Sequence, residues 1–111
     1  MRGARVIYDV KKVINIIESS KIYIGCFIIS LQSRKTQYVD KIINNILRIS
    51  YNSNINYIII PINSNNDIDI MRELGLMFNP VLAVYKNGFI KRQFDIFADQ
   101  YIIENYINTY I

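Results

Sequence analysis

The side chains that most often carry out chemistry in proteins are scarce in this sequence. The chain has 111 residues, one cysteine (Cys26) and no histidine. A Ser/His/Asp triad and a His/Cys metal site are therefore excluded, because each needs residues that the chain lacks. Asp67 and Asp69 stand two residues apart at the start of an expected helix, where capping explains them better than an acid/base pair does. Since no Gly-rich nucleotide motif occurs either, the sequence predicts no cofactor, no metal and no catalytic residue.

Cys26 is the one residue with reactive potential, and its surroundings argue against reactivity. It lies in the run Ile22–Leu31, which contains no charged residue. A cysteine buried in such a segment acts as a small hydrophobic residue with a raised pKa. We expect Cys26 to pack in the core; the alternative is a monothiol or mixed-disulfide role. A single cysteine also forms no intrachain disulfide, which fits a reducing, intracellular location.

The basic residues offer a second kind of chemistry, the binding of anions. The chain carries 13 Lys+Arg against 9 Asp+Glu, a net charge of +4 that is spread along its length. Arg34 and Lys35 precede an expected helix whose first turn presents amide donors, so they are candidates for an anion site; a solvated loop is the alternative. Together with Lys41 and Arg48 on that helix, they also suggest a basic, nucleic-acid-associated subunit of a ribonucleoprotein or similar assembly.

A second basic group, Lys86, Lys91 and Arg92, falls on or near an expected edge strand. These residues suit an anionic partner, but lysines on edge strands commonly block strand addition, and we favour that interpretation. The chain also has nine tyrosines interleaved with basic residues, an arrangement that suits stacking on nucleic-acid bases. Tyr106 and Tyr110, however, keep the spacing of a helical core face, so we expect them to pack inward.

The elements that must position these residues follow from the hydrophobic pattern. Apolar residues recur at helical spacing in some segments, whereas 22–30 and 55–62 are free of charge, as is typical of strands buried on both faces of a sheet. The expected order is β-α-β-α-β-α-β-β-α, with strands near 5–8, 22–30, 55–62, 80–86 and 89–95 and helices near 10–19, 38–50, 67–74 and 99–110. The second helix is expected to pack Tyr38, Val39, Ile42, Ile43, Ile46 and Leu47, and the last helix Ile102, Ile103, Tyr106, Ile107 and Tyr110.

The firmest local signal is the segment Phe78–Phe89. In it, Pro80 precedes an apolar strand and Asn87-Gly88 separates this strand from the next. Asn-Gly is favoured in two-residue hairpin turns because both central residues need a positive φ. Gly75 stands where a helix is expected to end in the left-handed conformation, and Asp9 is expected to cap the first helix.

This order of elements resembles the thioredoxin superfamily. The match is best from Gly75 to Ile107, where a helix end, Asn79-Pro80, a strand, Lys86-Asn87-Gly88, an edge strand and a final helix follow in thioredoxin order. The resemblance implies an α/β thioredoxin-like fold, a single domain over 1–111 with a central mixed β-sheet flanked by helices. It also implies that Pro80 is the cis-proline that family members hold beside their redox site; the alternative is a trans-proline that begins a strand.

The departures from the family concern the redox site itself. In redox thioredoxins a Cys-x-x-Cys opens the second helix, whose N-terminus lowers a thiol pKa. The corresponding segment Ser30–Lys35 has no cysteine, and one alignment places Ser30 and Ser33 at the cysteine positions. The chain has no tryptophan, and Gly25 stands near the position of the family's buried acidic residue. Dithiol oxidoreductase activity is therefore not expected.

The resemblance still implies a groove beside Pro80, although the cysteines that would give it redox chemistry are missing. We expect Gln32, Ser33, Asn79 and Pro80 to border it, and an extended partner segment to pair with its backbone groups. The chain is accordingly interpreted as a redox-inactive thioredoxin-like protein, a structural or protein-interaction module such as a subunit of a larger complex or a viral accessory protein. The abundance of Ile, Asn and Tyr is typical of an AT-rich genome.

The partners expected from the sequence are of limited kinds. A protein partner is favoured, nucleic acid is the alternative, and the high apolar content of 51% also suits a homodimer. No membrane association is expected, because the longest apolar run is about half of the roughly 20 residues that a membrane-spanning helix needs. The expected location is intracellular, with cytoplasm, nucleus and virion all open.

Overall fold

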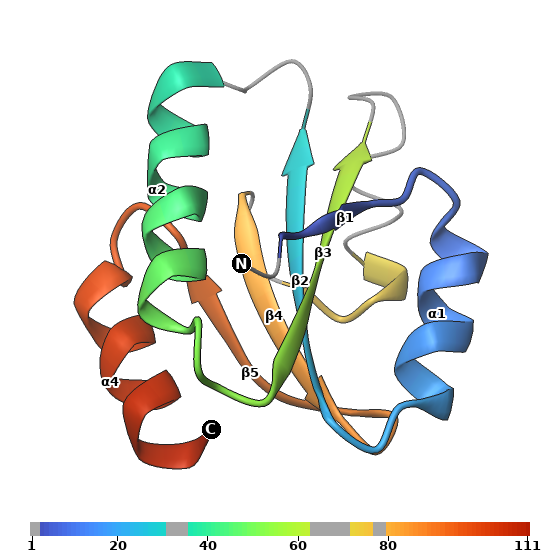
Figure 1. The fold of residues 1–111 in the computed structure, drawn as a ribbon. Helices are drawn as coiled ribbons and strands as arrows, with labels where there is room; N and C mark the ends of the chain where they lie inside the picture. The colour runs from blue at the N-terminus through green and yellow to red at the C-terminus, as the bar shows by residue number, and fades with distance from the viewer. Residues whose placement is uncertain (1–2, 31–35, 63–71, 77–79) are drawn as a thin grey trace.

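The computed structural model describes residues 3–30, 36–62, 72–76 and 80–111. Within them, one sheet has the strand order β1-β3-β2-β4-β5, with α1 on one face and α2 and α4 on the other (Figure 1). The strands are β1 (Arg5–Val6), β2 (Tyr23–Ser30), β3 (Ile55–Ile62), β4 (Val81–Lys86) and β5 (Phe89–Asp95), and the helices are α1 (Val10–Ser19), α2 (Thr36–Ile49) and α4 (Gln100–Tyr110). The sheet is mixed, because β1 and β2 run parallel to β3 while β4 runs antiparallel to β2 and β5.

Strand β2 is the centre of the sheet, as its charge-free sequence predicts. It pairs along its whole length with β3, and from Ile24 to Ile28 with β4. Its side chains alternate between two apolar clusters. Phe27 and Ile29 join the cluster under α2 and α4, while Ile24, Cys26 and Ile28 join the cluster under α1. A strand covered on both faces has no position for a charged side chain.

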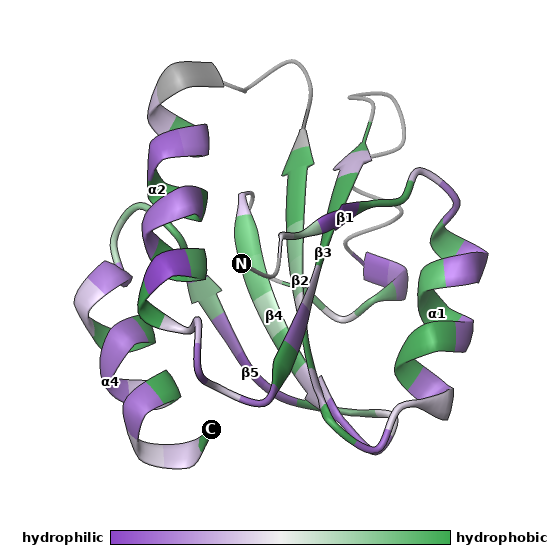
Figure 2. Cartoon of the chain, in the orientation of Figure 1, coloured by the Kyte–Doolittle hydropathy of each residue, from purple (hydrophilic) through white to green (hydrophobic). Residues whose placement is uncertain are grey.

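The helices are amphipathic and turn their apolar sides to the sheet. Figure 2 shows this as hydrophobic stripes facing inward and hydrophilic residues facing outward. The predicted cap of α1 is confirmed, since the Asp9 carboxylate accepts a hydrogen bond from the Lys11 amide at 3.0 Å. Val13 and Ile17 then anchor this helix in the core.

The predicted hairpin is confirmed. Asn87 and Gly88 have φ values of 55° and 82°, the positive pair that a type I′ turn requires. Gly75 has the expected left-handed φ of 72°. Strand β5 lies at the end of the strand order, as predicted for an edge strand. Most of the helix expected near 67–74 lies outside the described residues.

Three predictions about buried side chains are wrong. Tyr38, Ile102 and Tyr110 are 55%, 43% and 64% exposed, although each was expected to pack inward. A helix turns about 100° per residue, so Val39 and Ile103 take the sheet-facing positions and their preceding neighbours come out at the edge of the stripe. Tyr110 is the last residue of α4, beyond the final buried position at Ile107.

The start of α4 also differs from the prediction. The helix begins at Gln100 and Asp99 is its cap residue, but the Asp99 side chain makes no capping bond. Its carboxylate instead accepts a hydrogen bond from the Asp95 amide at 2.9 Å. Asp99 therefore closes the turn that leads from β5 into α4.

Candidate functional site

Of the predicted groove, the structure describes only Pro80, which lies at the end of the sheet where β2 ends and β4 begins. The last described pair between these strands is Ile28 with Val81, so Pro80, the residue before Val81, lies next to the end of β2. Pro80 is buried. The other predicted groove residues, Gln32, Ser33 and Asn79, and the predicted anion ligands, Arg34 and Lys35, lie outside the described residues, as does the geometry of the peptide bond before Pro80. The groove and the anion site therefore stay predictions.

Cys26 does not lie at the end of the sheet where Pro80 lies. It lies in the middle of β2, opposite Ile58 on β3 and Ala83 on β4, and is 1% exposed. Burial raises the pKa of its thiol to about 12. The predicted role in the core is confirmed. A thiol that is both protonated and covered is neither a nucleophile nor a metal ligand at neutral pH.

Gly25, which the resemblance places near the family's buried acidic residue, lies against an aromatic ring. A Cβ atom added at Gly25 would lie 2.6 Å and 2.7 Å from two ring carbons of Tyr57. The Tyr57 ring stacks on Phe27 with a centroid distance of 5.4 Å. Its hydroxyl lies 2.7 Å from the hydroxyl of Ser50, which in turn donates to the carbonyl of Ile46. The space beside Gly25 is thus filled by the Tyr57 ring, which stacks on Phe27 and whose hydroxyl is hydrogen-bonded to Ser50.

The clearest surface feature near the start of α2 is a pair of stacked aromatic rings. Tyr38 of α2 and Phe97, between β5 and α4, stack with a centroid distance of 5.6 Å, yet they are 55% and 39% exposed. Tyr101, in the first turn of α4, is 74% exposed. A hollow of about 360 Å³ adjoins this pair and is lined by Tyr38, Lys41, Ile42, Asn45 and Gln100. We call Tyr38, Phe97 and Tyr101 the α2–α4 aromatic surface.

The spacing of Tyr38 fits the apolar stripe of α2 and so predicts burial, and no helical or strand pattern includes Phe97. Phe97 follows the last residue of β5 by two positions, in a turn where its amide donates to the Asp95 carboxylate at 2.9 Å. A large aromatic residue in a tight surface turn was the available sign of an exposed ring.

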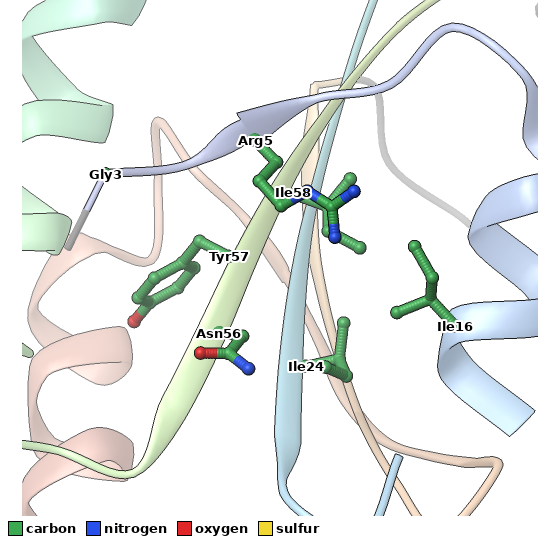
Figure 3. Close-up of a pocket in the computed structure, with 7 residues that line it drawn as sticks. All are labelled: Gly3, Arg5, Ile16, Ile24, Asn56, Tyr57 and Ile58. Atoms are coloured by element: carbon green, nitrogen blue, oxygen red, sulfur yellow. The ribbon is translucent and has the colours of Figure 1, made fainter. Parts of the chain in front are cut away.

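A pocket of about 370 Å³ lies between β1, the adjoining strands and α1, and nothing in the sequence pointed to it. It is lined by Gly3, Arg5, Ile16, Ile24, Asn56, Tyr57 and Ile58 (Figure 3). In Figure 3 the Arg5 side chain lies over β3 beside Ile58, and Ile16 projects from α1 toward the sheet. Ile24 and Ile58 are each 2% exposed, so the floor is closed and apolar. Of its polar side chains, Arg5 and Asn56 are exposed and the buried Tyr57 has its hydroxyl 2.7 Å from the Ser50 hydroxyl, so we assign the pocket no chemistry.

Two of the basic residues predicted to form a nucleic-acid surface, Lys41 and Arg48, lie on α2. Lys41 is exposed and lines the hollow next to Tyr38. Arg48 stands seven residues further on, about two helical turns along the same face, and donates a hydrogen bond to the side chain of Asn45 at 2.6 Å. Arg34 and Lys35 lie outside the described residues, so a nucleic-acid interface along this helix stays a prediction.

The basic residues predicted near the edge strand lie in a different setting. Lys86 has its ammonium nitrogen 4.6 Å from the ring centroid of Tyr23. Arg92 has its guanidinium carbon 5.2 Å from the ring centroid of Phe94 and 5.9 Å from that of Tyr106. Both cations thus lie over aromatic rings, which the sequence pattern alone did not indicate.

No group of three or more His, Cys, Asp or Glu side chains in residues 3–30, 36–62, 72–76 and 80–111 is placed to hold a metal ion. None of the helices in this part of the chain combines the length and the apolar character that crossing a bilayer requires.

Comparison with known proteins identifies the fold. No protein-family model and no curated protein matches the chain in sequence. Among solved structures, thioredoxin from Trypanosoma brucei brucei matches with a TM-score of 0.73 at 10% identity, over 96% of this chain and 88% of that one. Thioredoxin from Plasmodium falciparum matches with a TM-score of 0.68 at 12% identity, over 95% of this chain and 99% of that one. A chain from a structure of the thiol-resolving mechanism of yeast mitochondrial 1-Cys peroxiredoxin matches with a TM-score of 0.71 at 10% identity, over 96% of this chain and 94% of that one. At these identities the likeness shows the fold alone, and it confirms the predicted thioredoxin-like fold.

Proposed function

We propose that this thioredoxin-like fold serves as a protein-interaction module that does not carry out dithiol exchange. The observation that carries the proposal is the stacked Tyr38–Phe97 pair, which stays on the surface beside the first turn of α2. Aromatic residues are enriched at the centres of protein interfaces, because they bury a large area with few rotatable bonds. Rings held together but left half exposed are suited to being covered by a partner.

The α2–α4 aromatic surface and the predicted groove belong to one contact region in this proposal. Tyr38 follows the segment 31–35 within the first turn of α2, and Pro80 lies at the same edge of the sheet. An extended partner segment that pairs with the backbone near Gln32, Ser33 and Asn79 would continue over Tyr38 and Phe97. Main-chain pairing would supply affinity and the aromatic rings would supply selectivity.

The absence of thiol chemistry in the proposal rests on Cys26. It is the chain's only cysteine, it is buried, and it lies opposite Ala83 rather than at the edge that Pro80 marks. A partner bound at that edge would meet no thiol from this chain. We infer that the chain acts by holding its partner, as a subunit of a larger complex or as a viral accessory protein does.

The experiment is cross-linked affinity capture from the native source, with the double variant Tyr38→Ser/Phe97→Ser. Tyr8→Ser is the matched control, because Tyr8 is 72% exposed and precedes α1 on the other face of the sheet. We expect the double variant to capture at least tenfold less of a specific partner than the unaltered chain does, and Tyr8→Ser to capture the same amount. Equal capture by all three proteins would exclude the aromatic surface, and unchanged capture by Pro80→Ala and Gln32→Ala would exclude the groove.

A further inference from the structure

A second aromatic surface lies at the opposite end of α4 and carries positive charge. Six side chains from β2, the β4–β5 hairpin and α4 form it: Tyr23, Lys86, Phe89, Arg92, Tyr106 and Tyr110. The strand register brings them together, since Lys86 pairs with Phe89 and Val84 pairs with Arg92. Val84 belongs to the apolar cluster under α2 and α4, and Lys86, two residues further on, points to the same side. Phe89 and Arg92 stand opposite these two residues and share their face, because the ladder has a register shift between Val84 and Tyr85. We call this set the basic–aromatic surface.

The two cations of this surface are held in place by rings. The Lys86 ammonium lies 4.6 Å from the centroid of Tyr23, and the Arg92 guanidinium lies over Phe94 and Tyr106. Such contacts orient a cation without neutralising its charge. Within the described residues, neither cation forms an ion pair with a carboxylate. Positive charge that is held at the surface and, in the described part of the chain, is not paired with a carboxylate is an electrostatic match for an anionic partner.

The aromatic rings of this surface keep free faces beside the cations. Phe89 and Tyr110 are 70% and 64% exposed. The rings of Tyr106 and Tyr110 are 4.9 Å apart, so Tyr110 continues the row that begins at Phe94 and Tyr106. The Tyr106 hydroxyl is a hydrogen-bond donor at neutral pH, as any tyrosine hydroxyl is, and burial raises the pKa of Tyr106 further. The surface offers flat apolar faces, cations and hydroxyl donors within one small area.

We propose that the basic–aromatic surface binds single-stranded nucleic acid. Phosphates contact Lys86 and Arg92, and unpaired bases stack on Phe89 and Tyr110. An acidic protein segment would satisfy the cations but would leave the exposed ring faces without a flat partner. A duplex would hide its base faces within its own stack. The site is separate from the α2–α4 aromatic surface, so this activity does not depend on the proposed function.

The test is fluorescence anisotropy with labelled oligouridylate and oligothymidylate, titrated with the full chain at several salt concentrations. We expect binding whose logarithmic affinity falls linearly with the logarithm of salt. The variant Lys86→Gln/Arg92→Gln should bind at least tenfold more weakly, with a salt slope reduced by about 1.4 for two lost phosphate contacts. The variants Phe89→Ser and Tyr110→Ser should each lose about tenfold while keeping the slope, because they remove stacking and not charge.

Matched controls on the other face of the sheet make the result specific. Lys11→Gln/Lys12→Gln removes two exposed cations of α1, and Tyr8→Ser removes an exposed ring. Both controls should bind like the unaltered chain. Circular dichroism confirms that each variant is folded, and Tyr110→Ser changes only the last residue of α4. The proposal is overturned by absence of binding at low salt, by equal losses in the α1 controls, or by polyglutamate competing as well as the oligonucleotides.

Discussion

The thiol of Cys26 gives the most direct test of whether this thioredoxin-like fold is without thiol chemistry. Cys26 is the only cysteine, so any labelling reports on one site. The residue is 1% exposed and lies between β3 and β4. We predict that a thiol reagent such as DTNB reacts with the native protein at least about 1,000-fold more slowly than with the unfolded chain.

The magnitude follows from two routes of reaction. Burial raises the pKa of Cys26 from its ordinary value of 9.0 to about 12, so at a pH below 9 the thiolate fraction of the native protein falls about 1,000-fold. The second route is transient opening, in which the thiol regains its ordinary pKa. For a domain stable by about 5 kcal/mol, the open fraction is roughly 1 in 5,000. Both routes therefore predict a slow reaction.

The assay compares the labelling rate in buffer with the rate in concentrated guanidinium chloride, with Cys26→Ala as the blank. Labelling in buffer should accelerate on adding sub-denaturing amounts of guanidinium if opening is the route that operates. A native rate within tenfold of the unfolded rate would refute the reasoning. It would mean that the thiol is accessible and ionisable, and that monothiol chemistry is within reach of this protein.

Further predictions concern the stability of the interior. Gly25→Ala should lower the free energy of unfolding by about 1–3 kcal/mol in urea denaturation, because its Cβ would meet the Tyr57 ring at 2.6 Å; unchanged stability would contradict this contact. Ser50→Ala should cost about 1–3 kcal/mol, since it leaves the buried Tyr57 hydroxyl without its partner, and Tyr57→Phe in the same background should recover part of that loss. Tyr85→Phe should be neutral or stabilising, because the Tyr85 hydroxyl is buried with no hydrogen-bond partner in the described part of the chain; a loss above about 1 kcal/mol would reveal one. The raised pKa of Cys26 stabilises the fold fully below about pH 9, and this contribution is lost as the pH rises toward 12, by at most about 1.4 kcal/mol per pH unit. Cys26→Ala should flatten that alkaline decline, and an identical pH profile in the variant would exclude the thiol as its cause.

The parts of the fold that follow from neighbouring residues were predictable. The Asn87-Gly88 turn, the Asp9 cap and the central position of β2 each depend on a short stretch of sequence, and the structure confirms all three. Contacts between distant segments were not predictable in the same way. That Tyr57 fills the space above Gly25 depends on the register of β3 against β2, which no local pattern states.

The same limit explains the two aromatic surfaces. Tyr38 and Tyr110 fit the apolar spacing of their helices, so periodicity assigned both to the core. Their exposure depends on where the sheet and the neighbouring helix end, and on which rings meet them there. Tyr38 meets Phe97 across the α2–α4 boundary, and Tyr110 meets Tyr106 next to Arg92. Spacing identifies a helix face, whereas tertiary contacts decide how much of that face is covered.

The packing around Gly25 bears on what kind of thioredoxin-like protein this is. By the family resemblance, a buried acidic residue stands near this position in redox members. A carboxylate placed here would displace the Tyr57 ring, together with its stack on Phe27 and its hydroxyl contact with Ser50. The packing at Gly25 therefore leaves no room for an acidic side chain of that kind unless the Tyr57 ring moves.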